Sequence, residues 1–191
     1  DRERTPRDAQ GEWDFEALEA IDLALFDAHM KTLFARQHIR SPIYDFKSGK
    51  SLVDQGAELS LDDPRSVLLV EGLHALNPTI LGSCSPHRER EDTFRLFVHP
   101  ATALPFDRLT TVLPEDLRLI RRIVRDRHQR GYSASQSIAR WPSVRRGEER
   151  HVFTCIGEAD FIFDTSLVYE LAVLRVYAER YLLEIPERDA T

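Results

Sequence analysis

The feature that most constrains the fold is a continuous apolar run, Val67-Leu68-Leu69-Val70, which is closed by Glu71 and Gly72. Such a run is typical of a strand buried on both faces, as in a parallel sheet that helices cover on either side. Ligands bind at the carboxyl ends of the strands in sheets of this kind. We therefore expect Glu71, at the end of this strand, to lie near a functional site.

Short strands and helices alternate along the rest of the chain. Further strands are predicted at 94–98 and 161–163, and helical stretches at 113–131, 134–140, 144–151 and 165–183. This alternation predicts an α/β layer architecture.

The amino-terminal third is expected to be simpler. The first dozen residues are charged and end at Gly11, which indicates an exposed loop. Apolar residues at helical spacing then predict an amphipathic helix that starts at Asp14 or Glu16 and ends near Arg36. An edge hairpin is predicted over 42–61, with its turn at Ser48-Gly49-Lys50.

Composition excludes several classes of protein. With 191 residues, of which 42% are hydrophobic and 30% charged, the chain is predicted to be one globular domain over 1–191. A net charge of −6 argues against a general nucleic-acid surface. Two cysteines give neither a disulfide framework nor a zinc site. No apolar run is long enough to cross a bilayer and the start lacks a signal peptide, so a cytoplasmic protein is expected.

The run RLIRRIVRDRHQRG, at 118–131, places four arginines on one face of a helix. They are Arg118, Arg121, Arg122 and Arg125, spaced at i, i+3, i+4 and i+7, and we call them the arginine row. Guanidinium groups donate forked hydrogen bonds to phosphate oxygens and can neutralise charge in a transition state. A solvated helix face with ordinary surface arginines explains the spacing equally well. Leu117, Ile120 and Val124 would form the packed face.

Other candidates carry weaker signals. Glu71 could organise magnesium, although a glutamate before a glycine is common at strand ends. Tyr44 and Phe46 could stack on a base, but core packing is the simpler interpretation. The histidines, including His74, show no metal-ligand spacing and are interpreted as structural.

Taken together and in order, these segments resemble the uridine kinase and phosphoribulokinase family. The matching pieces are WDFEALEAID at 13–22, PIYDF at 42–46, VLLVEGLHAL at 67–76, RLIRRIVRDRHQRGYSASQSI at 118–138 and EADFIFDTSLVYELAVL at 158–174. DRERTPRD at 1–8 and WPSVRRGEE at 141–149 are most similar to bacterial uridine-kinase-like domains that follow a threonyl-tRNA-synthetase-type (TGS) region. The resemblance implies a P-loop NTPase-like three-layer sandwich with a mainly parallel sheet and an arginine-rich helical lid within 113–151.

The resemblance also implies roles for single residues. Phe15 and Glu16 would contact the nucleoside, with the Glu16 carboxylate on ribose hydroxyls. Tyr44 would flank the base, Arg118 would lie near it, and Gln136 would help to close the pocket. The residues implied near the reacting groups and the ATP phosphates are Glu71 beside Mg²⁺, and Arg121, Arg122, Arg125 and Arg130 in the lid. ATP and Mg²⁺ would be the cofactors and a nucleoside the partner, with a homo-oligomer left open.

The sequence departs from the family pattern in two places. The base-reading histidine of the family falls at Gly49, which leaves uridine or cytidine specificity open. A GxxxxGK[ST] loop and the acid that precedes the DRE segment do not occur in these residues and are expected upstream of Asp1, together with the first strand. The chain alone is therefore expected to be inactive as a kinase. Two alternatives stay open: a degenerate kinase-fold module that binds nucleotide or RNA, and a kinase of another small-metabolite alcohol.

Overall fold

A computed structural model describes residues 1–8, 11, 13–45, 48–84 and 92–186. The chain divides into two compact units, and each is described by itself. The first unit is Asp1–Arg95 with Gly147–Ala159, and the second is Leu96–Arg146 with Asp160–Thr191. The predicted lid segment, 113–151, contributes to both. That 1–191 form one kinase domain stays a prediction.

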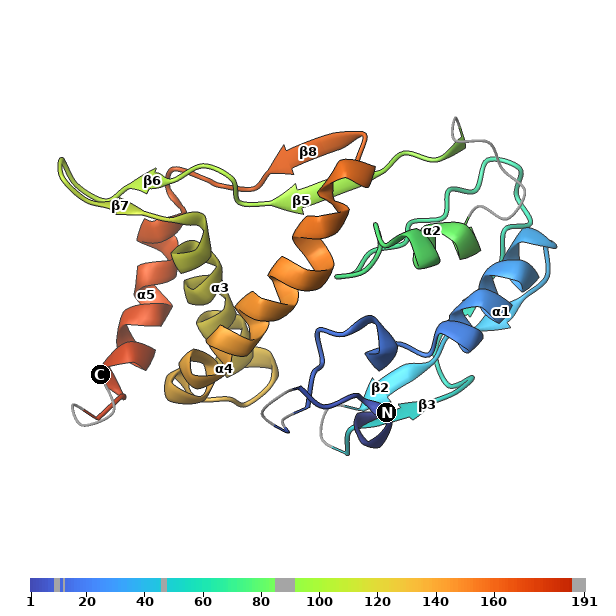
Figure 1. Ribbon diagram of the computed structural model, residues 1–191, viewed down its shortest axis with the longest axis horizontal. Helices are drawn as coiled ribbons and strands as arrows, with labels where there is room; N and C mark the ends of the chain where they lie inside the picture. Colours follow the sequence, from blue (N-terminus) through green and yellow to red (C-terminus); the bar gives the residue numbers. More distant parts are fainter. Residues whose placement is uncertain (9–10, 12, 46–47, 85–91, 187–191) are drawn as a thin grey trace. The chain divides into compact units, whose positions relative to one another are not determined.

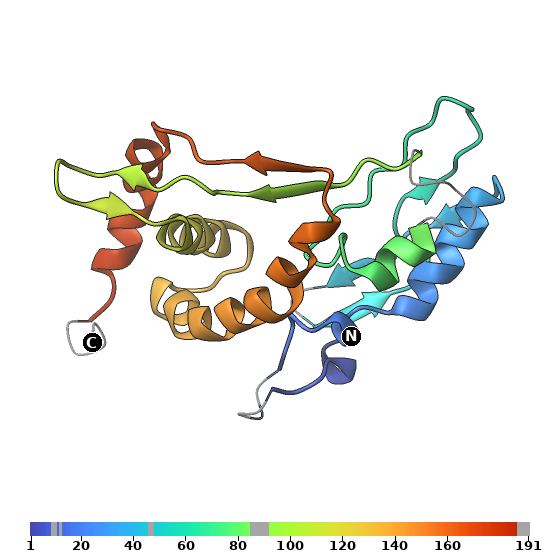
Figure 2. The same cartoon turned by 45° about the horizontal axis from the view of Figure 1, so that its top comes forward.

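The first unit combines short helices with two antiparallel ladders (Figure 1). β1 (Ile39–Arg40) pairs with β4 (Glu58–Leu59), and β2 (Ile43–Asp45) pairs with β3 (Lys50–Leu52). Helices α1 (Leu23–Phe34) and α2 (Pro78–Cys84) lie side by side in both views of the ribbon (Figures 1 and 2). Two 3₁₀ helices (Arg2–Arg4 and Leu18–Ala20) precede α1, and a π-helix (Glu148–Val152) followed by a 3₁₀ helix (Phe153–Glu158) completes the unit.

The core of the first unit forms around α1. Met30, Leu33 and Ile39 are buried, and Leu33 is only 1% exposed. Five partly buried side chains pack against them: Phe26, Phe34, Leu61, Leu68 and Cys84. Burial of this apolar surface is the main contribution to the stability of the unit.

Helix α1 begins later than the sequence predicts. It starts at Leu23, where the carboxylate of Asp22 accepts a hydrogen bond from the Leu25 N–H and so caps the helix. Asp14 instead accepts from the N–H of Glu16 in a local turn. The apolar residues at helical spacing therefore belong to two elements, the 3₁₀ helix at Leu18–Ala20 and α1. The predicted helix start at Asp14 or Glu16 was wrong, because the residue that caps α1 is Asp22.

Removal of this cap has a predictable effect. Asp22→Ala is expected to lower the free energy of unfolding by about 1 kcal/mol, because the Leu25 N–H loses its acceptor. Asp22→Asn is the matched control, since its amide oxygen keeps the cap and loses only the exposed ion pair with Arg4. Urea denaturation measures both. Equal destabilisation by the two variants would mean that the charge, and not the cap, matters.

The run at 67–70 does not form the predicted strand. Val67 and Leu69 are 89% and 84% exposed, while Leu68 packs against the α1 core. A strand buried on both faces needs neighbouring strands, and no described segment of the chain pairs with this run. Only one side of the run is therefore covered.

The amino-terminal segment is also not the exposed loop that was predicted. The Arg2 N–H donates to the carbonyl of Gly49 at 2.7 Å, and Ser51 N–H donates to the Asp1 carboxylate at 2.6 Å. Thr5 is 6% exposed. These contacts hold the segment against the β2–β3 hairpin, whose predicted turn is confirmed. The hairpin spans 43–52 and not 42–61, because residues 58–59 pair with β1 instead. Gly49 has φ +71° in the turn, and a Cβ at this position would collide with the Arg2 side chain, so both backbone and space require glycine.

The second unit contains a parallel strand pair and three helices. β5 (Leu96–His99) pairs in parallel with β8 (Phe161–Asp164), in a register that sets His99 opposite Asp164. β6 (Leu104–Pro105) and β7 (Thr111–Val112) form an antiparallel ladder. Helix α3 (Pro114–Gln129) packs against α5 (Glu170–Leu183). The α/β architecture is thus confirmed, whereas a mainly parallel sheet is found only in part, because one of the four ladders among the described residues is parallel.

Two helix boundaries in this unit differ from prediction. Helix α4 (Ala134–Gly147) runs through Pro142, where a break at 141–143 was expected. A proline inside a helix removes one hydrogen bond, and the packed residues Ala134 and Val144 on either side hold the helix together. Helix α5 begins at Glu170 and not at Thr165, because Thr165 and Ser166 form the contacts described below. Among the described helices, none has both the length and the apolar character needed to cross a membrane.

Candidate functional site

Helix α3 presents the arginine row. The most buried residues of its packed face are Leu117 and Ile123, which are 0% and 2% exposed, while Ile120 and Val124, predicted for this face, are half-buried. Pro114 opens the helix and two acids, Glu115 and Asp116, stand in its first turn, where they oppose the positive end of the helix dipole. Amphipathicity therefore fixes which side of α3 the arginines occupy.

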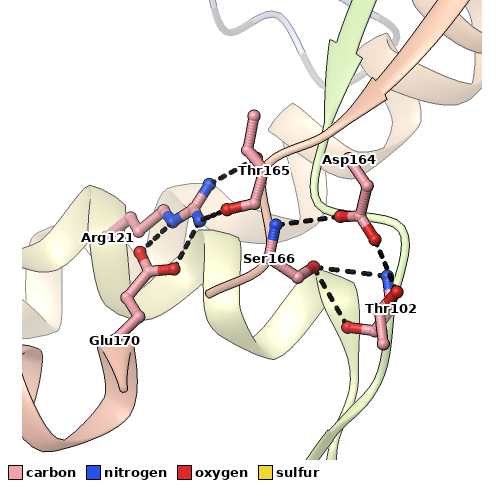
Figure 3. A network of polar contacts seen from close by, with 6 residues as sticks. All are labelled: Thr102, Arg121, Asp164, Thr165, Ser166 and Glu170. Atoms are coloured by element: carbon pink, nitrogen blue, oxygen red, sulfur yellow. Dashed lines mark hydrogen bonds and ion pairs between the residues drawn. The ribbon is translucent and has the colours of Figure 1, made fainter. Parts of the chain in front are cut away.

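Arg121 is tied to the start of α5 (Figure 3). Its guanidinium pairs with both carboxylate oxygens of Glu170 and also donates to the Thr165 hydroxyl at 3.0 Å and to the Thr165 carbonyl at 2.7 Å. The side chains of Arg121 and Glu170 are 29% and 14% exposed. A bidentate pair at this depth holds the guanidinium in one orientation.

A second charge cluster surrounds Asp126, whose side chain is only 3% exposed. Arg122, Arg125 and Arg130 each place a guanidinium nitrogen 3.1–3.3 Å from its carboxylate oxygens. The Ser137 hydroxyl of α4 donates to the same carboxylate at 3.5 Å. One buried acid thus anchors three of the arginines that the family resemblance assigns to the lid, and their net charge remains positive.

Beside Arg121, Asp164 joins the loops that follow β5 and β8 (Figure 3). Its carboxylate accepts from the N–H groups of Ala101 and Ser166, each at 2.8 Å, and from the Thr102 hydroxyl. The Ala101 N–H, and then the Thr102 hydroxyl and the Ser166 N–H, hold the pKa of the Asp164 carboxyl well below its usual range. The carboxyl ends of the two parallel strands are therefore fixed to each other.

The carboxyl end of β5 is electropositive. Burial lowers the pKa of the His99 imidazole, and the guanidinium of Arg118 lowers it further. Arg121 and Arg145 lower this pKa by smaller amounts, whereas the carboxylate of Asp164 raises it. The Arg118 guanidinium carbon lies 5.9 Å from the centre of the Trp141 ring, which orients it by a cation–π contact. Three guanidinium groups and one carboxylate thus act on His99 at this end of the strand.

Gln136 has a structural role in this arrangement. Its side-chain oxygen accepts from the Ser133 N–H at 2.9 Å, while its own N–H donates to the Ser133 hydroxyl at 3.2 Å. This reciprocal pair is a capping box at the start of α4. The predicted role of Gln136 in closing a nucleoside pocket remains a prediction.

In the first unit, Glu16 lies against the segment that begins at Gly147. A Cβ at Gly147 would overlap with the Cβ and Cγ of Glu16, so the Glu16 side chain packs against the Gly147 backbone as closely as only glycine permits. Glu16 is half-buried, and Phe15 beside it is 40% exposed. Behind them lies the buried ring of His74, whose pKa responds to the backbone of Glu16 and Ala17.

Tyr44 and Glu71 are exposed in the same unit. Tyr44, in β2, is paired with Ser51 of β3 and is 37% exposed, whereas Phe46 lies outside the described residues. Glu71 is exposed directly after the run 67–70. Mg²⁺ keeps several waters and takes one or two carboxylates together with substrate phosphates, so a single Glu71 fits as one ligand. The described residues contain no group of three His, Cys, Asp or Glu that could hold a metal by itself.

The sequence-predicted site residues therefore fall into two sets. Arg118, Arg121, Arg122, Arg125, Arg130 and Gln136 belong to the second unit, and Phe15, Glu16, Tyr44 and Glu71 to the first. The partners Asp126, Asp164 and Glu170 were not predicted. Asp126 could have been suspected as the single acid within the run 118–130, whereas no local signal marks Glu170 or Asp164.

Comparison with known proteins follows the same segments. The model of the phosphoribulokinase / uridine kinase family matches residues 2–82 and 107–171, which is more than half of the chain. A uridine kinase of Bacillus pumilus is 33% identical over 127 residues, covering 66% of this chain and 49% of that protein. A uridine kinase of Chloroflexus aurantiacus is 29% identical over 183 residues, covering 93% of this chain and 76% of that protein.

The match thus spans about half the length of the Bacillus relative. The family segments include those that carry Glu16, Glu71 and the arginine row. The resemblance first drawn from short motifs is therefore confirmed: the chain belongs to the phosphoribulokinase and uridine kinase family.

Proposed function

We propose that this chain is part of an ATP-dependent nucleoside kinase that transfers the γ-phosphoryl group to a hydroxyl of a uridine- or cytidine-like nucleoside. The observation that carries the proposal is the family match over 2–82 and 107–171. The similarity to bacterial uridine kinases supports the acceptor class. The similarity of the segments at 1–8 and 141–149 to domains that follow a TGS region belongs to the same proposal.

The family resemblance assigns nucleoside contacts to residues of each unit, and each set is taken by itself. The Glu16 carboxylate accepts hydrogen bonds from the ribose hydroxyls, beside the exposed ring of Phe15. Tyr44 flanks the base. In the second unit, the resemblance assigns Arg118 and Gln136 to nucleoside binding. Hydrogen bonds that substrate hydroxyls donate to a carboxylate discriminate strongly between nucleosides and analogues that lack the hydroxyl, because such an analogue leaves the carboxylate unpaired.

The phosphates are proposed to be held by arginines and by Glu71. Arg121 and Arg122, followed by Arg125 and Arg130, donate to phosphate oxygens and offset the charge that spreads over them during transfer. The ion pairs with Glu170 and Asp126 support this role by orienting the guanidinium groups in advance. Glu71 is one ligand of Mg²⁺, which supplies charge neutralisation between the phosphates when bound.

A single carboxylate tests the acceptor assignment. In the full-length gene product, Glu16→Gln is expected to lower kcat/KM for uridine about 10- to 100-fold, because hydrogen bonds from ribose to a charged acceptor are lost. Glu3→Gln, which alters an exposed carboxylate of the same unit, is the control and should leave kcat/KM unchanged. Steady-state phosphorylation with labelled ATP provides the measurement.

The alternatives give different outcomes in that assay. Turnover of another alcohol, with no effect of Glu16→Gln, would indicate a kinase of a different small metabolite. Binding of ATP or RNA without turnover of any acceptor would indicate a degenerate binding module, which the glycine at position 49 would then explain. We also propose that these 191 residues alone do not phosphorylate uridine, since no GxxxxGK[ST] loop occurs in them. Clear turnover by the isolated chain would refute this.

A further inference from the structure

His74 is buried in a way that its sequence context does not explain. It lies in the turn after Glu71-Gly72 and is 4% exposed. The backbone of Glu16 and Ala17 lies near the ring nitrogens, but neither nitrogen forms a well-oriented hydrogen bond with a described residue. Buried polar side chains are nearly always hydrogen-bonded, because leaving a donor or acceptor unpaired is costly. An imidazole in this position therefore calls for a reason other than simple packing, for which leucine would serve better.

The ring lies where three segments of the first unit meet. The backbone of Glu16 and Ala17 acts on it from one side, and Ala17 is itself 6% exposed. The His151 ring, in the π-helix, stands edge-on with its centre 6.0 Å away. Gly147, at the start of the same helical segment, is in contact with Glu16. His74 thus lies next to the backbone that carries Glu16.

The charge state of this imidazole is set by its neighbours. Burial is the largest influence and lowers the pKa of His74, and the nearby His151 lowers it further. The backbone groups of Glu16 and Ala17 and the carboxylate of Glu19 act in the opposite direction but do not outweigh burial. At neutral pH the ring is accordingly uncharged.

We propose that His74 is a positioning residue for Glu16: the neutral imidazole, packed between the Glu16–Ala17 backbone and His151, holds the Glu16 carboxylate in place, and protonation of His74 displaces it. This inference rests on the proposed role of Glu16 in nucleoside binding. Protonation would place a charge where burial is nearly complete and a second histidine is adjacent, so the segment must move to admit water. Nucleoside binding is then lost on acidification while ATP binding is not.

The experiment measures the Kd of uridine by calorimetry on the full-length gene product, from about pH 5 to pH 8. Below the pKa of His74, the wild-type Kd for uridine is expected to rise up to tenfold for each unit by which the pH falls, because binding is linked to the release of one proton. His74→Leu, which does not titrate, should abolish this rise. His38→Gln is the matched control, because His38 is exposed and ion pairs with Glu58 and Asp62 raise its pKa. It should retain the acid-dependent loss.

A second readout does not depend on a variant that folds. In uniformly labelled wild-type protein followed by NMR, the His74 ring should titrate below the ordinary value for histidine, and the backbone amide of Glu16 should shift with the same midpoint. An ordinary midpoint, an unresponsive Glu16 amide, or an acid-dependent loss that persists in His74→Leu would overturn the inference. Absence of uridine binding at every pH would instead reject the proposed function.

Discussion

Asp126→Asn is expected to lower the free energy of unfolding of the second unit by about 3–5 kcal/mol, the cost of removing one partner from a buried ion-pair cluster. Three guanidinium groups, from Arg122, Arg125 and Arg130, lie 3.1–3.3 Å from this carboxylate. Asparagine keeps the shape but not the charge, so three like charges would remain together, two of them mostly buried. Urea denaturation followed by tryptophan fluorescence measures the change.

The control for this prediction is Glu179→Gln on α5. Glu179 pairs with Arg175 on the surface, where the two side chains are 54% and 74% exposed. Water and salt screen such a pair, so the denaturation midpoint should not move. If Asp126→Asn behaved like Glu179→Gln, the cluster would not stabilise the fold, and the arginines would have to be held by packing alone.

Arg121→Met is expected to destabilise the same unit by about 2–4 kcal/mol, because it leaves the Glu170 carboxylate without its cation. Glu170 is 14% exposed and pairs with Arg121 through both oxygens. Thr165 also loses two donors, one to its hydroxyl and one to its carbonyl. Methionine retains much of the aliphatic stem, so the change reports mainly on the lost charge and hydrogen bonds. Thermal and urea unfolding measure it.

Arg125→Met provides the matched comparison within the arginine row. Its side chain is 44% exposed, and Asp126 keeps Arg122 and Arg130 when it is removed, so a loss of about 1 kcal/mol or less is expected. Fluorescent-ATP titration of both variants then separates two roles. Weaker ATP binding with unchanged stability in Arg121→Met would mean that the contacts with α5 are incidental and that Arg121 acts on ligand alone.

Local signals in the sequence predicted the elements that are specified locally. The helix expected at 113–131 is α3, because its amphipathic repeat, opening proline and first-turn acids all lie within one segment. The hairpin turn at Gly49 was equally predictable from its residues. The run at 67–70 was not, because a strand is completed by its neighbours, and the apolar pattern carries no information on whether a neighbour is present.

The candidate site was predictable only in its charged residues. The arginine row follows from helical spacing, but its partners come from elsewhere in the chain, as Glu170 does from α5. Burial was equally hidden: His74 is inconspicuous in the sequence and lies among segments that begin at Glu16 and Gly147. Long-range contacts of this kind depend on tertiary packing, which residue spacing does not encode.

The hydrogen bonds of Asp164 also determine when this part of the fold can form during synthesis. Its carboxylate joins Thr102 across a sequence separation of 62 residues, which includes α3 and α4. During synthesis, β5 leaves the ribosome long before its parallel neighbour β8 exists, and until then its unpaired edge and apolar side chains are exposed to solvent. Slowing translation between these strands should therefore increase the demand of the nascent chain for chaperones.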